Sequence, residues 1–289
     1  MFGYFRMFFV PLLLLSPTTP LAVAQDTADN AASPAVYLPK ELEEFAREMD
    51  SKFPKSRAEL TNETDPLVVY GDRLLELARG EDGNVSFIAS CCLIEWGYGT
   101  EVDPQYKFML EGMKLIRSRH RDNPHLSAAI RRTGGGGIPE VENEEFLRSL
   151  LKESKNPTVK AAAALQLAAL LEMLGRELQA NPNVEKLVAE GVTSVNGLDW
   201  SEEKKRSAIQ AHKTLIRAYA GRNGDEMVSE AKQLLESIVH EFPDERRSYD
   251  ELFPWTKYRT LPRVYRSEAS FPTYGELAKK RLLAMQSRN

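Results

Sequence analysis

The sequence predicts an all-α protein whose helices stack as antiparallel pairs, in the manner of an α-solenoid of the tetratricopeptide-like kind. Two observations predict this class: an Asx residue followed by proline recurs along the chain, and apolar residues recur at helical spacing. No segment shows the strong apolar–polar alternation that is typical of a half-buried strand. The Asx-Pro pairs are Asp65-Pro66, Asp103-Pro104, Asn123-Pro124, Asn156-Pro157 and Asn181-Pro182.

Each Asx-Pro pair has the chemistry of a helix start. The Asx oxygen accepts a hydrogen bond from a backbone N–H of the first turn, and proline fits the first helical position because no N–H is needed there. The first four pairs each precede a stretch with helical spacing. The start at Asn181-Pro182 stays open, because Asn183 is an alternative cap.

Long apolar stripes indicate the main helices and their buried faces. These stripes run from Val85 to Trp96, from Tyr106 to Ile116, from Leu167 to Leu178 and from Met227 to Val239. Residues at i, i+3, i+4 and i+7 share one face of a helix, so we expect each of these helices to bury one face.

The C-terminal helices carry their own start signals. We expect Ser201 to cap a helix that runs to Tyr219, and Asp225 to cap the next helix, which ends near Phe242. The short glycine-flanked turn between them predicts that these helices pack together as an antiparallel pair. The last helix opens with Thr273-Tyr274-Gly275-Glu276, the pattern of a capping box.

Composition divides the chain into consecutive segments, of which the glycine run and the aromatic loop are the clearest breaks between helices. The predicted segments are a signal peptide at 1–24, a flexible lead-in at 25–37, an N-terminal helical half at 38–133, a glycine-rich linker at 134–138 and a C-terminal helical half at 139–289, which includes an aromatic loop at 243–272.

The first residues have the pattern of a secretory signal. Arg6 precedes a short apolar run, and Ala22-Val23-Ala24 matches the small-x-small pattern that signal peptidase reads. We therefore expect cleavage after Ala24 and an exported chain, periplasmic or extracellular, with no stable membrane span after cleavage. The alternative is that the apolar run stays as an N-terminal anchor.

Charge and cysteine content exclude further classes. The formal net charge of −4 argues against a general nucleic-acid binder. Cys91 and Cys92 are the only cysteines. Adjacent Cα atoms lie about 3.8 Å apart, whereas unstrained disulfides need about 4.4–6.8 Å, so we expect no bond between them.

Parts of the C-terminal half resemble the helical N-terminal region of exported bacterial thioredoxin-like (redoxin) proteins. The similar stretches are Leu150 to Ala163, Glu230 to Asp244, and Thr273 to Ala278 with Leu282. In that group the last stretch leads into a redoxin domain with a reactive Cys-x-x-Cys. The sequence through Asn289 holds no Cys-x-x-Cys, so no catalytic residue carries over. The resemblance implies a helical docking module.

The aromatic loop is the first candidate for a binding site. Tyr, Trp and Arg are the residue types enriched in interface hot spots. The alternative is that the rings seal the end of the helical stack. The candidate partner-binding residues are Trp255, Tyr258, Arg259, Tyr265 and Arg266.

A dense basic patch is the second candidate. Cations are stabilised near a helix C-terminus, which is the simpler interpretation of this patch. The alternative is a site for an anion or an acidic partner, built together with the neighbouring glycine run. The patch residues are Arg117, Arg119, Arg121, Arg131 and Arg132, with His120 between them.

No pattern of metal ligands, phosphate loop or catalytic nucleophile is present, so we expect no metal and no cofactor. His212 shares an apolar helix face and is expected to be a core residue. The sequence therefore favours an exported, non-catalytic helical scaffold that binds a protein or peptide partner. The alternatives are an accessory of envelope thiol–disulfide chemistry and a small-ligand-binding protein or enzyme of unrecognised type.

Overall fold

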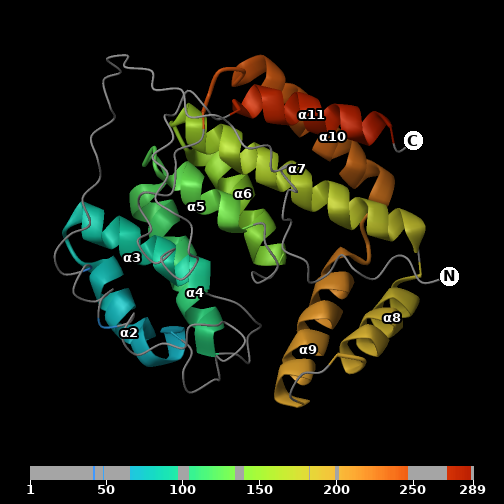
Figure 1. The fold of residues 1–289 in the computed structure, drawn as a ribbon, viewed down its shortest axis with the longest axis horizontal. Helices are drawn as coiled ribbons and strands as arrows, with labels where there is room; N and C mark the ends of the chain where they lie inside the picture. Colours follow the sequence, from blue (N-terminus) through green and yellow to red (C-terminus); the bar gives the residue numbers. More distant parts are fainter. Residues whose placement is uncertain are drawn as a thin grey trace, which may run out of the picture.

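The protein is seen here in a computed structural model, which describes residues 42, 48, 66–96, 104–133, 140–181, 183–198, 202–246 and 272–287. Within those residues every regular element is a helix, and the one β-type contact is an isolated bridge between Arg246 and Thr273. Figure 1 shows a helical body from which one pair of helices projects. The all-α prediction is confirmed.

The first group of helices surrounds α3. It comprises α2 (Pro66–Arg79), α3 (Gly83–Trp96), α4 (Pro104–Leu115), the π-helix η2 (Ile116–His120) and α5 (Leu126–Thr133). Helix α3 packs against α2, α4, η2 and α5. All side chains from Val85 to Ile94 are buried, so the expectation that this helix buries only one face is wrong.

Small polar residues make the all-round burial of α3 tolerable. Ser90 donates a hydrogen bond to the carbonyl of Ser86 at 2.7 Å, inside the helix. Serine hydroxyls that bond back to the helix leave no unsatisfied polar group in the core. Cys91 and Cys92 are buried and form no disulfide, as expected of small core residues.

The second group is built around α7 (Pro157–Ala180), which packs against α5, α6 (Glu140–Glu153), α10 (Gly224–Glu241) and α11 (Tyr274–Gln286). Helices α7 and α10 cross at a glycine contact. A Cβ on Gly175 would lie 2.8 Å from the Gly224 carbonyl oxygen, and one on Gly224 would lie 2.6 Å from that of Gly175. The absence of side chains at both positions lets the two backbones touch.

Helix α7 is the one helix, among the residues described, that is long and apolar enough to cross a membrane. Of the most apolar 18-residue stretch of this helix, 72% is buried inside the protein. Helix α7 also carries Glu172 and Arg176, which form an ion pair with an N–O distance of 3.1 Å. These features fit the central helix of a folded core.

Helices α8 (Val184–Asn196) and α9 (Glu202–Tyr219) form the projecting pair, which is visible at the lower right of Figure 1. The pair has a small hydrophobic cluster of its own, with Leu187, Val188 and Ile216 buried in it. The predicted packing of α9 against α10 is wrong, because α9 packs on α8 and α10 packs on α7 and α11.

Two described helix starts settle or correct the Asx predictions: the alternative left open at Asn183 holds, and the cap predicted at Asp225 is wrong. Asn156 caps α7 and Asn183, rather than Asn181, caps α8. Asp225 was expected to cap α10, but Asn223 does so by accepting a bond from the Asp225 N–H, and Asp225 lies in the first turn. The capping box at Thr273 is confirmed.

A single hydrophobic core extends through both predicted halves of the chain. It includes residues of α2 to α5 together with residues of α6, α7, α10 and α11. The predicted signal peptide, lead-in and glycine linker lie outside the described residues.

Candidate functional site

The aromatic candidates Trp255, Tyr258, Arg259, Tyr265 and Arg266 lie outside the described residues, but the chain on either side of them is well defined. Arg246 and Thr273 pair in an antiparallel bridge. The Tyr274 N–H donates to the Glu245 carbonyl at 2.8 Å, which closes the same junction. The residues on either side of the segment 247–271 therefore lie next to each other.

Neighbouring elements hold this junction firmly. A Cβ on Gly275 would lie 2.6 Å from the carbonyl oxygen of Pro243, so the first turn of α11 sits directly on the end of α10. Thr158, in the first turn of α7, donates a hydrogen bond to the carboxylate of Glu245. Tyr274 is buried, with 2% of its surface exposed. We call these contacts the junction clamp.

Three arginines of the basic patch, Arg117, Arg119 and Arg121, contact other parts of the fold. Arg119 donates from Nη1 to the carbonyl of Arg79 at 3.1 Å, and from Nη2 to the carbonyl of Gly80 at 2.7 Å. These groups lie at the C-terminal end of α2, where backbone carbonyls lack helical partners. The charge is thus favoured by a helix C-terminus, but by that of α2 rather than that of its own helix.

Two further arginines of the patch share one carboxylate. Arg117 and Arg121 lie 3.8 Å and 3.5 Å from the carboxylate oxygens of Glu153 on α6. Exposed pairs of this kind contribute little stability, roughly 0–1 kcal/mol. The side chains of Arg131 and Arg132 lie outside the described set, so the anion site formed by all five arginines stays a prediction.

His120, the residue between these arginines, has an unpredicted environment. It is the last residue of the π-helix η2, and only 8% of it is exposed. Its Nε2 lies 2.9 Å from Oγ of Ser86 on α3, and its ring meets Phe87 edge-on at 5.7 Å between centroids. Burial, and then the positive charge of Arg119, lower the pKa of His120 to about 4. The imidazole is therefore neutral at pH 7.

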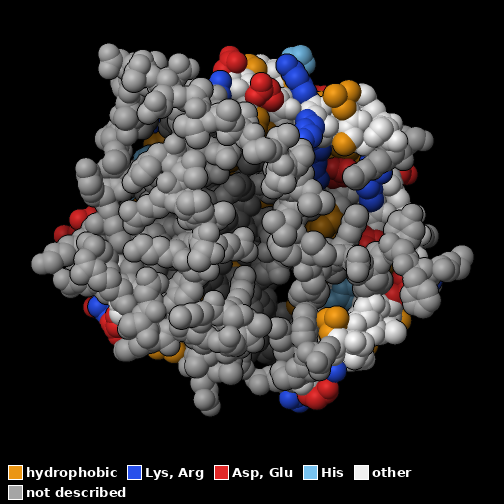
Figure 2. Space-filling model, viewed as in Figure 1, with side chains coloured by type: hydrophobic (Ala, Val, Ile, Leu, Met, Phe, Trp, Pro, Cys, Tyr) orange, Lys and Arg blue, Asp and Glu red, His pale blue; other side chains and the backbone are white. Residues whose placement is uncertain are grey.

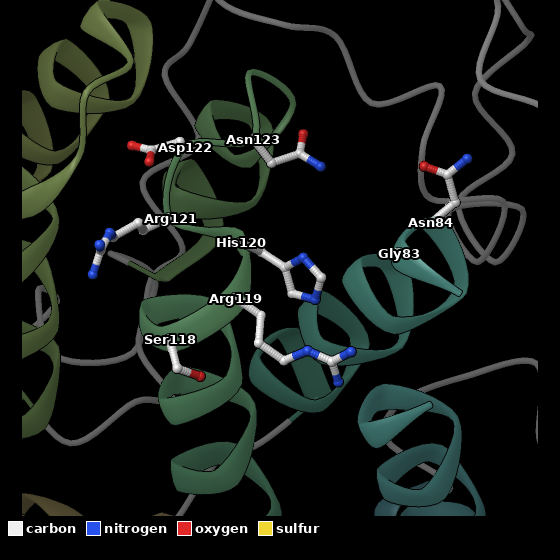
Figure 3. Close-up of a pocket in the computed structure, with 8 residues that line it drawn as sticks. All are labelled: Gly83, Asn84, Ser118, Arg119, His120, Arg121, Asp122 and Asn123. Atoms are coloured by element: carbon white, nitrogen blue, oxygen red, sulfur yellow. The ribbon is translucent and has the colours of Figure 1, made fainter. Parts of the chain in front are cut away.

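A serine–histidine pair invites comparison with a nucleophile and its base. Ser86 has none of its surface exposed, and its Oγ also lies 2.5 Å from the carbonyl of Ala78. A hydroxyl that no substrate can reach does not act as a nucleophile in this conformation. The other side of the imidazole lines a depression of about 410 Å³, drawn in Figure 3.

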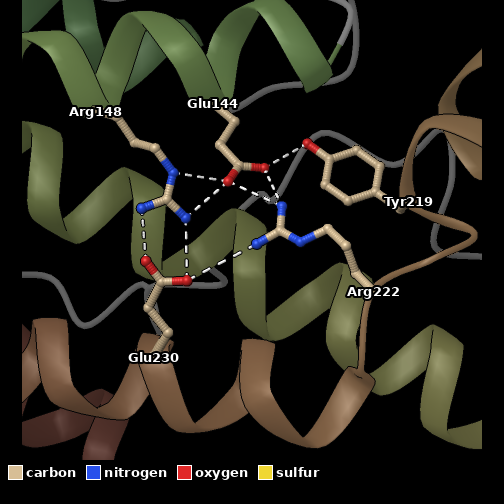
Figure 4. A network of polar contacts seen from close by, with 5 residues as sticks. All are labelled: Glu144, Arg148, Tyr219, Arg222 and Glu230. Carbon is tan, nitrogen blue, oxygen red and sulfur yellow. Dashed lines mark hydrogen bonds and ion pairs between the residues drawn. The ribbon is translucent and has the colours of Figure 1, made fainter.

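A network of charges around the buried carboxylate of Glu144 is the second unpredicted feature (Figure 4). Glu144 on α6 accepts hydrogen bonds from Tyr219 at 2.7 Å, from Arg148 at 2.8 Å and from Arg222 at 2.7 Å. Arg148 also donates to both carboxylate oxygens of Glu230 on α10, at 2.6 Å and 3.0 Å. The network thus joins α6, the end of α9, the α9–α10 connection and α10.

The electrostatics of this network favour ionised groups. Burial alone would raise the pKa of Glu144, but hydrogen bonds from Tyr219, Arg148 and Arg222 outweigh it and hold that pKa below its usual value. Two carboxylates face two guanidinium groups, so the charges balance. The arrangement is that of a structural ion-pair network, whose acids are already occupied by cations.

The cysteines take the core role expected of them, whereas His212 is only half-buried, at the contact between α8 and α9. His212 lies directly over Gly191 of α8, and its Nε2 lies 3.1 Å from the carbonyl of Leu187. Burial raises the pKa of the Cys91 thiol far above its usual range, so the reactive thiolate does not form. The described residues contain no group of three or more His, Cys, Asp or Glu placed to hold a metal ion.

The surface formed by α10 and α11 has a mixed character. Figure 2 shows basic, acidic and apolar side chains interspersed where these helices reach the surface. Exposed residues there include Lys232 and Glu236, which form a pair at 3.7 Å, and Leu283, which is 66% exposed. This surface serves below as a reference for substitutions elsewhere.

Comparisons with known proteins add no relative. No family model, no curated protein and no solved structure matches the chain. The resemblance to the helical region of redoxin proteins stays a prediction.

Proposed function

We propose that this protein is an exported helical scaffold that binds a protein or peptide partner in the cell envelope through the segment 247–271. The observation that carries the proposal is the junction clamp, in which Glu245 and Arg246 are bonded to Tyr274 and Thr273. A long segment whose two ends are fixed at one point of a rigid body is a frequent design for binding loops.

The chemistry of the segment supports binding to an acidic partner surface. Residues 255–266 include Lys257, Arg259, Arg263 and Arg266 and contain no Asp or Glu, although the whole chain has a net charge of −4. Trp255, Tyr258 and Tyr265 are interleaved with these cations. Aromatic rings supply buried contact area, and arginines supply bidentate hydrogen bonds to carboxylates.

The tetratricopeptide-like stacking forms part of the proposal. Helices α6 and α7 pack together, α10 and α11 pack together, and α10 lies against α7, as successive pairs do in a solenoid. On this interpretation α8 and α9 are inserted between two stacked pairs. The segment 247–271 then connects the two helices of the second pair.

The test begins with identification of the partner. A photo-crosslinking phenylalanine analogue at position 258 should capture one specific protein in the envelope fraction, whereas the same analogue at the exposed position 233 on α10 should not. The purified partner then allows calorimetric measurement of Kd.

The combined substitution Trp255→Ala, Tyr258→Ala and Arg259→Ala should weaken this Kd at least about thirty-fold, because a single hot-spot residue contributes roughly 2 kcal/mol or more. The matched control replaces Lys232, Gln233 and Glu236 by alanine and should leave Kd unchanged. If the triple variant instead loses its cooperative melting transition, the rings are structural and the proposal is wrong.

A further inference from the structure

The depression beside His120 combines features that the partner-binding proposal does not use. It is lined by Gly83 and Asn84 at the start of α3 and by the residues from Ser118 to Asn123, and its volume is about 410 Å³. His120 is the last, buried residue of a π-helix. Such helices are rare, and those that do occur are often found at functional sites. The volume lies within the usual range of small-molecule sites, roughly 300–1,000 Å³.

The hydrogen bonds of Ser86 determine which ring nitrogen of His120 carries the proton. Ser86 has a single hydroxyl proton, and its Oγ lies 2.5 Å from the carbonyl oxygen of Ala78, which can only accept. The proton is therefore directed to Ala78. The 2.9 Å contact between Ser86 Oγ and His120 Nε2 then requires a proton on Nε2.

This assignment leaves Nδ1 of His120 as a bare acceptor. A neutral imidazole carries one N–H and one lone pair, and the N–H is used on Ser86. Among the described residues none donates to Nδ1, and the ring forms part of the wall of the depression. Figure 3 shows the imidazole between Asn123 and the α3 residue Asn84.

The charges around Nδ1 of His120 indicate which kind of ligand can bind there. An anion is disfavoured because it would face the lone pair of Nδ1 and not a proton. A cation is disfavoured because two arginines of the wall, Arg119 and Arg121, outnumber its one carboxylate, Asp122, whose Oδ1 already accepts hydrogen bonds from Ser154 and Lys155. We propose that the depression binds a small neutral molecule that carries hydroxyl or amide N–H groups, one of which donates to Nδ1 of His120.

Asn84 supplies the complementary group on the opposite wall. Its side chain is exposed and makes no hydrogen bond with any other described residue, while its backbone N–H is used on Asp82. An amide can both donate to and accept from a hydroxyl, so Asn84 suits the other end of the same neutral ligand. A ligand held at both ends would span the depression.

Long-range proton–nitrogen NMR of the histidine rings tests both steps. The chain has four histidines, and the signal that disappears in His120→Gln identifies the ring. Without ligand this ring should show the Nε2–H tautomer at pH 7. Ethylene glycol, acetamide and glucose serve as neutral probes, with inorganic phosphate and ammonium as charged comparators.

At least one neutral probe should shift the Nδ1 resonance of His120 in a saturable way, and neither charged probe should do so. Asn84→Ala should weaken the binding of that probe roughly two- to ten-fold, which is the effect of losing one neutral hydrogen bond. Asn196→Ala, an exposed asparagine at the end of α8, is the matched control and should leave binding unchanged.

The Nδ1–H tautomer, saturation by phosphate or ammonium, or no saturable shift with any neutral probe would each overturn the proposal. Equal weakening by Asn84→Ala and Asn196→Ala would also overturn it. Because Asn84 lies on the surface, its variant keeps the test valid even if His120→Gln fails to fold.

Discussion

Replacing Glu144 with glutamine should destabilise the protein more than any comparable change on its surface. The side chain of Glu144 is 9% exposed, and its carboxylate neutralises Arg148 on its own helix and Arg222 after α9. Glutamine keeps the shape but removes the charge, and its NH₂ group must face a donor. At least one of Tyr219, Arg148 and Arg222 then loses its acceptor.

The magnitude follows from what remains around the two arginines. Removing one partner of a buried ion pair costs about 3–5 kcal/mol. Arg148 keeps its two bonds to Glu230, and the side chains of Arg148 and Arg222 are 40% and 32% exposed, so solvent compensates for part of the loss. We therefore expect Glu144→Gln to lower the free energy of unfolding by about 2–3 kcal/mol.

Urea denaturation followed by far-ultraviolet circular dichroism measures this difference. The matched control is Glu236→Gln, which removes an exposed pair with Lys232 and should cost less than about 0.5 kcal/mol. Amide hydrogen exchange gives a second, local measurement. Tyr219 and Arg222 bind the end of α9 to α6, so in Glu144→Gln the backbone amides of α8 and α9 should exchange faster relative to those of α7.

Equal effects of Glu144→Gln and Glu236→Gln would refute the energetic argument. A loss of stability with no preferential exchange in α8 and α9 would refute the claim that the network positions this pair. A double-mutant cycle between Glu144 and Arg222 separates their interaction from general disruption.

Further predictions concern His120, the cysteines and export. The folded pKa of His120, about 4, is below its ordinary value of 6.5. The unfolded chain therefore binds the proton first, and stability that is complete above pH 6.5 should fall as the pH drops towards 4. The loss should reach about 2 kcal/mol in urea titrations, less than the full shift implies because the ring borders solvent, and a flat profile would contradict this. Dithiothreitol should leave the melting temperature unchanged, because Cys91 and Cys92 are buried and form no disulfide that it could reduce. Intact mass of the exported form should place its first residue at Gln25, and retention of Met1 would refute cleavage.

The local parts of the fold were predictable because they depend on neighbouring residues. Asn156 caps the helix that its Asx-Pro pair predicts, and Thr273 forms its capping box with Glu276. Both involve contacts within one helical turn. Asp225 was the wrong cap for α10 because Asn223, two residues earlier, is equally suited, and only the backbone conformation separates the two.

The site around His120 was not predictable from spacing. Nothing in the residues from Ile116 to His120 distinguishes a π-helix from an α-helix, and the partner of the imidazole, Ser86, lies 34 residues away in the sequence. The basic patch shows the same limit. The sequence indicates that Arg119 suits a helix C-terminus, but the carbonyls that it caps belong to α2.

The error over α9 and α10 has a physical explanation in the polar network. A short turn between two amphipathic helices usually lets them pack together, and nothing local forbids it here. Arg222 and Tyr219 sit in or beside that turn, and both are bound to Glu144 on α6. At the start of α10, Gly224 fits against Gly175 of α7, where any side chain would collide with backbone. These contacts fix both sides of the turn to different partners, so α9 is directed towards α8 while α10 lies along α7. The packing of the C-terminal region is thus decided by a few long-range contacts of Glu144 and Gly175, which no periodic pattern in α9 or α10 reveals.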